Sequence, residues 1–182
     1  MQQHDHNAGG YFMADIRHKR PTARRAVAIG EFYAGATLLE QIIARKLPKG
    51  DALLLAEMAG IQGVKLASAL MPLCHPLPIE LVRVRCIPII EKALVRVYCE
   101  VATEARTGVE MEALAGVNSA LLTLYDLSKP VQPALSFGAV RLLFKEGGKK
   151  GLWLHPDGMS EAEGAHYQPQ KPHRLNAVSC AV

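Results

Sequence analysis

Residues 72–78 read Pro-Leu-Cys-His-Pro-Leu-Pro, and this proline-rich segment divides the chain into two hydrophobic patterns. Before it, apolar residues recur at the spacing of a helix, and after it apolar and basic residues alternate as in a half-buried strand. A helix has to end before Pro72, because proline disfavours helical backbone in the residue that precedes it. The chain must therefore combine helices and strands.

Apolar spacing and helix-breaking residues predict the order of the elements along the 182 residues. The predicted elements are a short strand at 11–16, a helix from Thr22 to Leu47 that is open to interruption near Gly30 or Gly35, a helix from Asp51 that ends before Pro72, strands at 81–86 and 95–101 that form an antiparallel hairpin, a helix over 109–128, and a strand over 140–145. This order is typical of an α+β domain, and we expect a ferredoxin-like antiparallel sheet with helices packed on one face.

The chain is long enough for one domain with a core of its own. We expect a flexible N-terminus over 1–10, a single domain over 11–153, and a mobile C-terminal tail over 154–182, where periodicity is low. We expect no secretory signal and no membrane partner, because the sequence shows neither a signal-peptide pattern nor an apolar run long enough to cross a bilayer. The four cysteines have no CxxC spacing and are typical of reduced thiols, so we expect a cytoplasmic protein.

The charge balance limits the kinds of partner. A net charge of +4 is mild for a nucleic-acid-binding domain and fits an anionic small ligand equally well. An RNA-binding module would expose aromatic side chains on its sheet for base stacking, and the predicted strands offer only Tyr98 and Phe144. We therefore expect a small-molecule ligand and no nucleic-acid partner.

Cys74 and His75 lie between two prolines, and Pro76 restricts the backbone of His75 so that its ring points in one direction. His75 suits a general acid or base or a phosphate-binding donor, or else a structural histidine that satisfies backbone carbonyls. Cys74 has no second Cys/His pair near it, so we expect no metal site. A buried thiol without a nearby cation stays protonated, which disfavours Cys74 as a nucleophile.

Charged residues near both ends of the last predicted helix are further candidates. Glu110 and Glu112 lie on one side only if residues 108–112 are extended; on a helix they point apart, and the alternative is two solvated acids at a helix start. Asp126 and Lys129 are neighbours near the helix C-terminus, where an aspartate does not stabilise the helix, and this favours a functional role over a surface ion pair.

The spacing between these two groups constrains any shared site. Glu112 and Asp126 are 14 positions apart. On a continuous helix this separation is about 21 Å of rise. If both groups serve one ligand, the site is shared between subunits or the helix breaks.

The lysines of segment 145–151 bracket two glycines, Gly147 and Gly148. Glycines let backbone amides approach an anion and lysines add positive charge, so the loop resembles a phosphate cradle. The GxxxxGK[ST] pattern of a P-loop is absent. A solvated basic turn is the alternative, and Lys49 has the same two interpretations.

Four motifs stand in an order that one known family shares: PLCHPLP at 72–78, RTGVEMEAL at 106–114, YDLSK at 125–129 and RLLFKEGGKKG at 141–151. The chain from Met13 to Gly151 resembles the molybdenum cofactor biosynthesis protein C family, the cyclic pyranopterin monophosphate synthases. The resemblance implies a ferredoxin-like α+β subunit, a homohexamer built as a trimer of dimers, and active sites at subunit interfaces. It also implies a lyase that converts 3′,8-cyclo-7,8-dihydroguanosine 5′-triphosphate to cyclic pyranopterin monophosphate and releases pyrophosphate.

The resemblance further implies which residues form the site. The family's substrate-contacting residues fall on Leu73, Cys74, His75, Met111 and Glu112, its catalytic aspartate on Asp126 and its essential lysines on Lys49, Lys129 and Lys145, and Glu110 lies in the same family motif. Together with the glycine-loop argument, this gives the expected catalytic residues Asp126, Lys129, Lys49 and His75 and the expected substrate-binding residues Leu73, Cys74, His75, Glu110, Met111, Glu112, Lys145 and Lys149. We interpret Asp126 with Lys129 as the acid/base pair. Lys49, His75 and Lys145 suit the stabilisation of negative charge as pyrophosphate leaves. The sequence requires no cofactor, and it leaves open whether Mg²⁺ accompanies the triphosphate.

The chain departs from the family pattern in the segments 65–69, 103–107 and 128–130, and its tail is longer than usual. Leu66, Ala67 and Ala69 stand where the family has an arginine, a threonine and an acid, and Ser128 replaces a cysteine. All the catalytic-type residues remain. These departures leave one alternative open, a non-catalytic paralogue that binds a purine triphosphate or a pterin without turnover.

Overall fold

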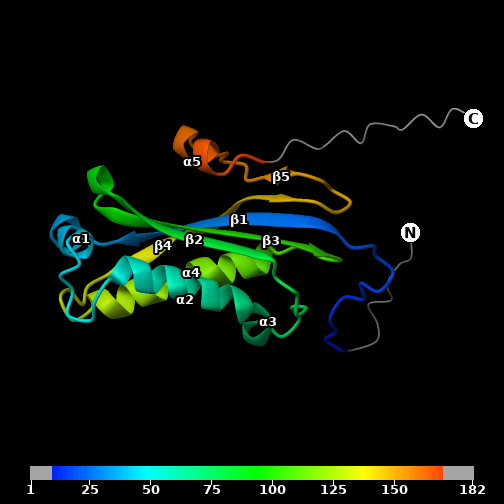
Figure 1. Cartoon of the computed structure of the whole chain (residues 1–182), viewed down its shortest axis with the longest axis horizontal. Helices are drawn as coiled ribbons and strands as arrows, with labels where there is room; N and C mark the ends of the chain where they lie inside the picture. The colour runs from blue at the N-terminus through cyan, green and yellow to red at the C-terminus, as the bar shows by residue number, and fades with distance from the viewer. Residues whose placement is uncertain (1–9, 170–182) are drawn as a thin grey trace, which may run out of the picture.

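The computed structural model describes residues 10–169, and Figure 1 shows the arrangement of the elements. In chain order they are β1 Thr22–Tyr33, α1 Ala36–Ile43, α2 Ala52–Lys65, α3 Ala67–Leu70, β2 Leu81–Ile89, the 3₁₀ turn η1 Ile90–Lys92, β3 Leu94–Ala105, α4 Glu110–Ser128, β4 Ser136–Glu146, β5 Trp153–Leu154 and α5 Glu161–His166. None of these helices has the length and apolar composition needed to cross a membrane. The predicted flexible N-terminus lies, except for Gly10, outside the described residues, as do residues 170–182 of the predicted tail.

One antiparallel sheet of five strands, in the order β2-β3-β1-β4-β5, forms the centre of the fold. β1 pairs with β3 along its whole length and with β4 on its other edge. Because β3 lies between β1 and β2, and α1 and α2 connect those two strands, the topology is a split β-α-β arrangement. The sheet and its helices confirm the predicted α+β class.

The two faces of the sheet are covered differently (Figure 1). α2 and α4 pack against each other and against one face, where they enclose the main hydrophobic core. α5 lies over the opposite face, where a smaller core contains Val27, Ile29, Phe144 and Tyr167. The expectation that helices pack on one face holds for α2 and α4, and α5 adds a helix on the other face.

The predicted helix from Thr22 to Leu47 is wrong, because its first half is the strand β1. Residues 26–29 are buried, since the side chains on both faces of this central strand contact a core. A strand that is buried on both faces shows a continuous apolar run, and the period of such a run does not distinguish it from a buried helix. Gly35, with a φ of 74°, then leads the chain into α1.

The other predicted elements differ from the structure less. Residues 11–16 form no strand, so that prediction is also wrong. The helix predicted from Asp51 divides at Leu66 into α2 and α3, and the Asp51 carboxylate caps α2 by accepting from the backbone N–H of Leu54 at 3.1 Å. The antiparallel hairpin of β2 and β3, the helix α4 and the strand β4 are confirmed.

A glycine allows α2 and α4 to approach each other closely. A Cβ atom added at Gly63 would lie 2.6 Å from Cβ of Ser119 and 2.9 Å from the carbonyl oxygen of Ala115, both on α4. We expect Gly63→Ala to lower the free energy of unfolding by about 1–3 kcal/mol, because the α4 backbone would have to move. Urea denaturation followed by circular dichroism measures this change.

Gly164→Ala in α5 is the matched control for that substitution. It also exchanges a helical glycine for alanine, but no described atom beyond the adjacent residues and the backbone of α5 lies within 4 Å of the added Cβ. Alanine has the higher helix propensity, so we expect no loss of stability from Gly164→Ala. Equal effects of the two substitutions would contradict the close approach of α2 and α4.

Candidate functional site

A cavity of about 890 Å³, which we call the α4 pocket, opens at the N-terminal end of α4. The chain between α3 and β2 and the chain that enters α4 form most of its wall. It is lined by Tyr11, Met71, Pro72, Leu73, Cys74, His75, Leu77, Thr107, Gly108, Glu110, Met111 and Glu112. The fold therefore brings the PLCHPLP and RTGVEMEAL motifs together, with all the substrate-binding residues that were predicted in them.

A buried carboxyl group and a thiol contact each other in this pocket. Glu112 is 3% exposed, and the Cys74 thiol donates to its Oε1 at 3.7 Å. Burial raises the pKa of Glu112. Burial, followed by the nearby Glu112 charge and the hydrogen bond to it, raises the pKa of Cys74. Cys74 is thus a protonated donor, and Glu112 is a carboxyl group that holds its proton more tightly than an exposed glutamate.

We expect the burial of Glu112 to make stability depend on pH. The folded state binds the Glu112 proton more tightly than the unfolded state, so the free energy of unfolding falls as pH rises above the ordinary glutamate pKa of 4.5. Glu112→Gln removes this titration. The free energy of unfolding of the variant minus that of the wild type should therefore rise as pH rises through and above 4.5. Below pH 4.5 this difference should be at its smallest. Chemical denaturation of both proteins from acid to neutral pH measures the difference.

Glu40→Gln on the exposed surface of α1 is the control for the pH dependence. It makes the same chemical change on an exposed side chain, and its stability is compared with that of the wild type over the same pH range. A stability difference for Glu112→Gln that is independent of pH would show that Glu112 titrates alike in the folded and unfolded states.

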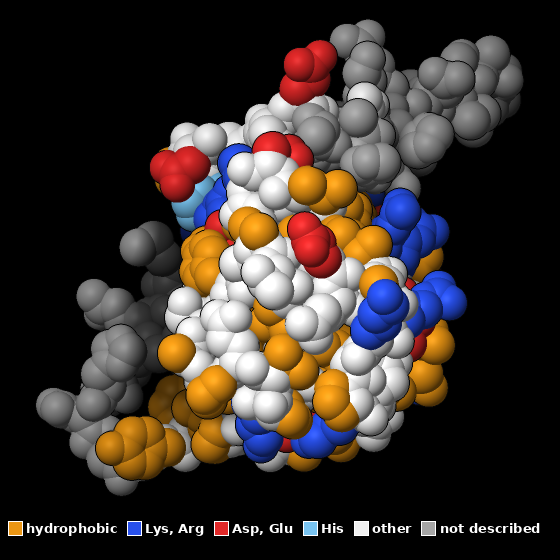
Figure 2. Space-filling model, turned by 90° about the vertical axis from the view of Figure 1, so that its left-hand side faces the viewer, with side chains coloured by type: hydrophobic (Ala, Val, Ile, Leu, Met, Phe, Trp, Pro, Cys, Tyr) orange, Lys and Arg blue, Asp and Glu red, His pale blue; other side chains and the backbone are white. Residues whose placement is uncertain are grey.

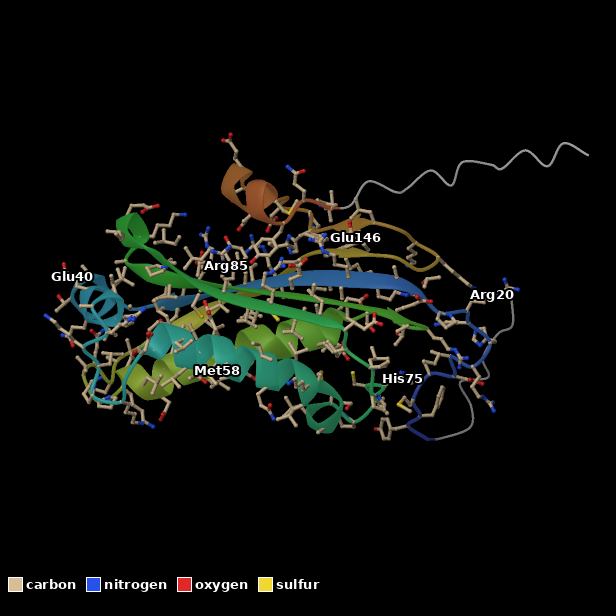
Figure 3. The ribbon with its side chains drawn as sticks, in the orientation of Figure 1. Arg20, Glu40, Met58, His75, Arg85 and Glu146 are labelled. Atoms are coloured by element: carbon tan, nitrogen blue, oxygen red, sulfur yellow. The ribbon has the colours of Figure 1, made fainter. Side chains whose placement is uncertain are left out.

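His75 is held by the N-terminal segment of the chain, which Figure 3 shows beside it. Its Nε2 lies 2.9 Å from the carbonyl oxygen of Ala14. A carbonyl oxygen only accepts, so Nε2 carries a proton and, in the neutral ring, Nδ1 is the acceptor. His75 does satisfy a backbone carbonyl, as the structural alternative required, and this contact also fixes which ring nitrogen can take up a proton.

Glu110 and Glu112 point to different sides, because α4 already begins at Glu110. Glu110 pairs with Lys145 on β4, with Oε1 and Nζ 2.5 Å apart, and it still lines the α4 pocket together with Glu112. A Cβ at Gly108 would collide with the Glu110 carboxylate, so a larger residue there would make this side chain move. The interpretation that residues 108–112 are extended is therefore wrong.

A second cavity of about 240 Å³, which we call the basic pocket, lies beside the α4 pocket and shares Glu110 with it. It is lined by Lys19, Arg24, Arg106, Thr107, Gly108, Glu110, Lys145, Glu146, Gly147, Lys149 and Lys150. Lys145 and Lys149 were predicted here, whereas the sequence analysis missed Lys19, Arg24 and Arg106. These three come from the segment before β1, from β1 itself and from the residue that directly follows β3, and their only sequence signal is their charge.

The two glycines of the basic pocket permit a tight backbone turn. Gly147 and Gly148 have φ angles of 97° and 71°, which favour glycine. A Cβ at Gly147 would meet the carbonyl oxygen of Ala23, and one at Gly148 would meet the Arg24 guanidinium. The turn therefore packs directly on β1, and it places cationic side chains from both strands around one small cavity.

A third cluster of charged side chains lies at the C-terminal end of α4. The Asp126 carboxylate accepts from Lys129 Nζ and from Lys49 Nζ, both at 2.8 Å. Hydrogen bonds from Lys129 and then Lys49 lower the pKa of Asp126 to about 2, and the same contact raises the pKa of Lys129. Figure 2 faces this end of the molecule and shows basic side chains at its lower edge.

The Asp126 cluster and the α4 pocket lie at opposite ends of one continuous helix. α4 runs unbroken through Glu110–Ser128. Glu112 and Asp126 are therefore separated by about 21 Å of helical rise. The structure excludes a helix break, so a single subunit does not bring Lys49, Asp126 and Lys129 to the ligand that the α4 pocket would hold.

Within residues 10–169, no group of three or more His, Cys, Asp and Glu side chains is arranged to hold a metal ion. The charged groups instead form a buried carboxyl-thiol pair, a cavity rich in lysine and arginine, and an exposed Lys-Asp-Lys cluster. Cationic side chains around a glycine turn suit phosphate groups. The fold and the site define the class as an α+β protein with pockets for an anionic small molecule.

The chain belongs to the MoaC family, whose profile matches residues 13–148. It is 43% identical to the cyclic pyranopterin monophosphate synthase of Dinoroseobacter shibae over 79% of this chain and 90% of that protein. It is 42% identical to the synthase of that name from Nostoc sp., over 79% of this chain and 86% of the relative. It is also 46% identical to a molybdenum cofactor biosynthesis bifunctional protein of Synechococcus elongatus, of which it spans 45%.

Proposed function

We propose that the protein is a lyase of molybdenum cofactor biosynthesis that acts as a cyclic pyranopterin monophosphate synthase. It would convert 3′,8-cyclo-7,8-dihydroguanosine 5′-triphosphate to cyclic pyranopterin monophosphate and release pyrophosphate. Membership of the MoaC family and the names of its relatives support this activity. The structural observation that carries it is the junction at Glu110 of a roomy pocket with a small cationic one.

The two joined pockets match the two ends of this substrate. The α4 pocket has the volume of an ordinary small-molecule site, and its buried Glu112 can exchange hydrogen bonds with the base-derived ring. The basic pocket offers Lys145, Lys149 and Arg24 to the triphosphate. Mg²⁺ carried by the triphosphate is part of the proposal, because Mg²⁺ commonly binds through substrate phosphates with few protein ligands.

The Asp126 cluster would complete the site from a neighbouring subunit. We infer a homo-oligomer, a hexamer built as a trimer of dimers, in which the C-terminal end of α4 in one subunit meets the α4 pocket of the next. The length of α4 supports sharing. So do Leu54 and Met58 on α2 and Leu122 on α4, because apolar side chains that are more than half exposed are typical of an interface. Figure 3 shows Met58 on the helix-covered side of the molecule.

The chemistry assigns a role to each group in the assembled site. Opening the guanine-derived ring and closing the pterin ring require proton transfers, for which Asp126 with Lys129 is the acid/base pair. Lys49, His75 and Lys145 would stabilise the negative charge that develops as pyrophosphate leaves. Action in the cytoplasm is also proposed, and the free thiols of Cys74, Cys86 and Cys99 are consistent with a reducing compartment.

One assay tests the proposal directly. The purified chain is incubated with the cyclised guanosine triphosphate, and both pyrophosphate and the pterin product are measured. Formation of both products in equal amounts would support the synthase. Tight binding without turnover would instead support the non-catalytic paralogue, for which Leu66 and Ala67 in place of the family's arginine and threonine are the sequence argument.

A further inference from the structure

Residues 149–169 follow the part of the chain that matches the family, and they include the short strand β5 beside the basic pocket. The MoaC profile ends at residue 148, and the described chain continues to 169. After the glycine turn, β5 pairs with β4 so that Trp153 stands opposite Lys145 and Leu154 opposite Phe144. This register places the indole beside the lysine that pairs with Glu110.

Trp153 lines a cavity that adjoins the basic pocket. This cavity, of about 520 Å³, is bounded by Glu110, Leu142, Lys145, Lys150, Leu152 and Trp153. Glu110, Lys145 and Lys150 line the basic pocket as well, so the indole and Leu152 form an apolar wall on its outer side. Trp153 is still 39% exposed and makes an edge contact with the His155 ring, which leaves indole surface for a ligand.

The segment that follows Trp153 packs on the sheet through Tyr167, near the end of the described residues. Tyr167 is buried and stacks on Tyr98 of β3, with ring centroids 5.0 Å apart. α5 begins with a capping box between Ser160 and Glu163, which defines where this helix starts. Figure 1 shows α5 over the face of the sheet opposite α2 and α4, and β5 is the edge strand next to β4.

An arginine connects this anchor to the basic pocket. Arg25 of β1 donates to Glu100 at 2.7 Å, to Glu146 at 3.2 Å and to the carbonyl oxygen of Gln168 at 3.1 Å. Glu146 directly follows Lys145 and also lines the basic pocket. Figure 3 shows Glu146 on the side of the sheet where α5 lies. Arg25 therefore binds both Gln168, at the end of the chain that follows β5, and Glu146, at the start of the glycine turn.

We propose that residues 149–168 form a strap that holds Trp153 as the outer wall of the polyphosphate subsite, with Tyr167 as its positioning residue. The inference rests on the proposed function and adds a ligand-contacting residue to it. An apolar wall excludes water, and exclusion of water strengthens the attraction between the lysines and a phosphate. The indole N–H can in addition donate a hydrogen bond to a phosphate oxygen.

Pyrophosphate is the probe for this subsite, and calorimetric titration of the full chain gives its Kd. We expect Trp153→Ala to weaken pyrophosphate binding by about fivefold, the scale of one hydrogen bond, and to raise KM for the triphosphate similarly with kcat changed less than about twofold. Leu154→Ala on the same strand is the matched control, because Leu154 does not line the cavity. It should leave both constants unchanged.

Fluorescence tests the anchor separately, since Trp153 is the single tryptophan of the chain. Pyrophosphate should change the wild-type emission in a saturable way. Without ligand, Tyr167→Ala should shift the emission of Trp153 to longer wavelength. It should also raise the Kd of pyrophosphate as much as Trp153→Ala does. Tyr167→Phe keeps the stacked ring, so its emission and its Kd should both match those of the wild type.

The outcomes separate this inference from the proposed function. If the wild type forms no pyrophosphate from the cyclised triphosphate, the proposed function fails. If the wild type turns over but Trp153→Ala binds pyrophosphate as tightly as Leu154→Ala, only the strap inference is overturned. A wild-type emission that saturating pyrophosphate does not alter overturns it equally.

Discussion

Replacement of Asp126 by asparagine should lower kcat by about 10²–10⁴-fold, the range typical of the loss of a general acid or base. The amide keeps the size of the side chain but cannot take up a proton at neutral pH. Lys49 and Lys129, which both donate to Asp126, remain in Asp126→Asn and can still bind phosphate. We therefore expect a smaller change in KM than in kcat. Steady-state rates of pyrophosphate release measure both constants.

Glu91→Gln is the control for the carboxylate-to-amide change, because Glu91 is exposed in η1 and lies outside the α4 pocket, the basic pocket, the Asp126 cluster and the strap. It should turn over at the wild-type rate. Thermal unfolding of Asp126→Asn should also resemble that of the wild type, since the aspartate is at the surface. Turnover of Asp126→Asn near the wild-type rate would remove Asp126 from the acid/base role.

The parts of the site that lie within single motifs could be predicted from the sequence. Pro76 restricts His75 locally, and the α4 pocket contains both residues of the Cys-His pair. Lys129 and Asp126 lie three apart on one helix, so their ion pair followed from helix geometry alone. In both cases the interacting groups are close in the chain, and local backbone rules are sufficient.

The parts that depend on distant segments could not be predicted. The sequence of β1 predicts a helix because burial on both faces removes the alternation that identifies a strand. Once β1 was misassigned, nothing linked Arg24 to the glycine turn, although β1 and β4 lie side by side in the sheet. Lys19 and Arg106 approach the same turn through the ends of other segments. The basic pocket therefore forms only because the order of strands in the sheet brings these distant segments together.

The C-terminal segment shows a weaker signal that could have been used. Ser160 and Glu163 have the Ser-x-x-Glu spacing of a capping box, which predicts the start of a helix. The low periodicity of the segment favoured a tail, because a helix as short as α5 presents too few apolar positions to show a period. One of its contacts with the sheet is the stack of Tyr167 on Tyr98, and this depends on the position of β3.

Two inactive variants should restore activity when their subunits are mixed. Asp126→Asn damages the cluster at the C-terminal end of α4, and Lys145→Ala removes the partner of Glu110 at the other end. If each site takes one group from each of two subunits, random mixing leaves about one site in four with both groups intact. Pyrophosphate release should rise from the level of either variant alone to about a quarter of the wild-type rate. If a single subunit formed the whole site, every site would keep one defect.

A mixture of Asp126→Asn and Lys129→Ala is the control for this experiment. Both residues belong to the same cluster. Each subunit in the mixture therefore has one substitution in its Asp126 cluster, and no combination of subunits forms an intact site. Native mass spectrometry shows whether subunits have exchanged in each mixture. Exchange without recovery in the Asp126→Asn and Lys145→Ala mixture would contradict a shared site. The continuous helix α4 would then separate Asp126 from the ligand by its own length, and the acid/base role would have to pass to groups at the α4 pocket, of which the buried Glu112 is the first candidate.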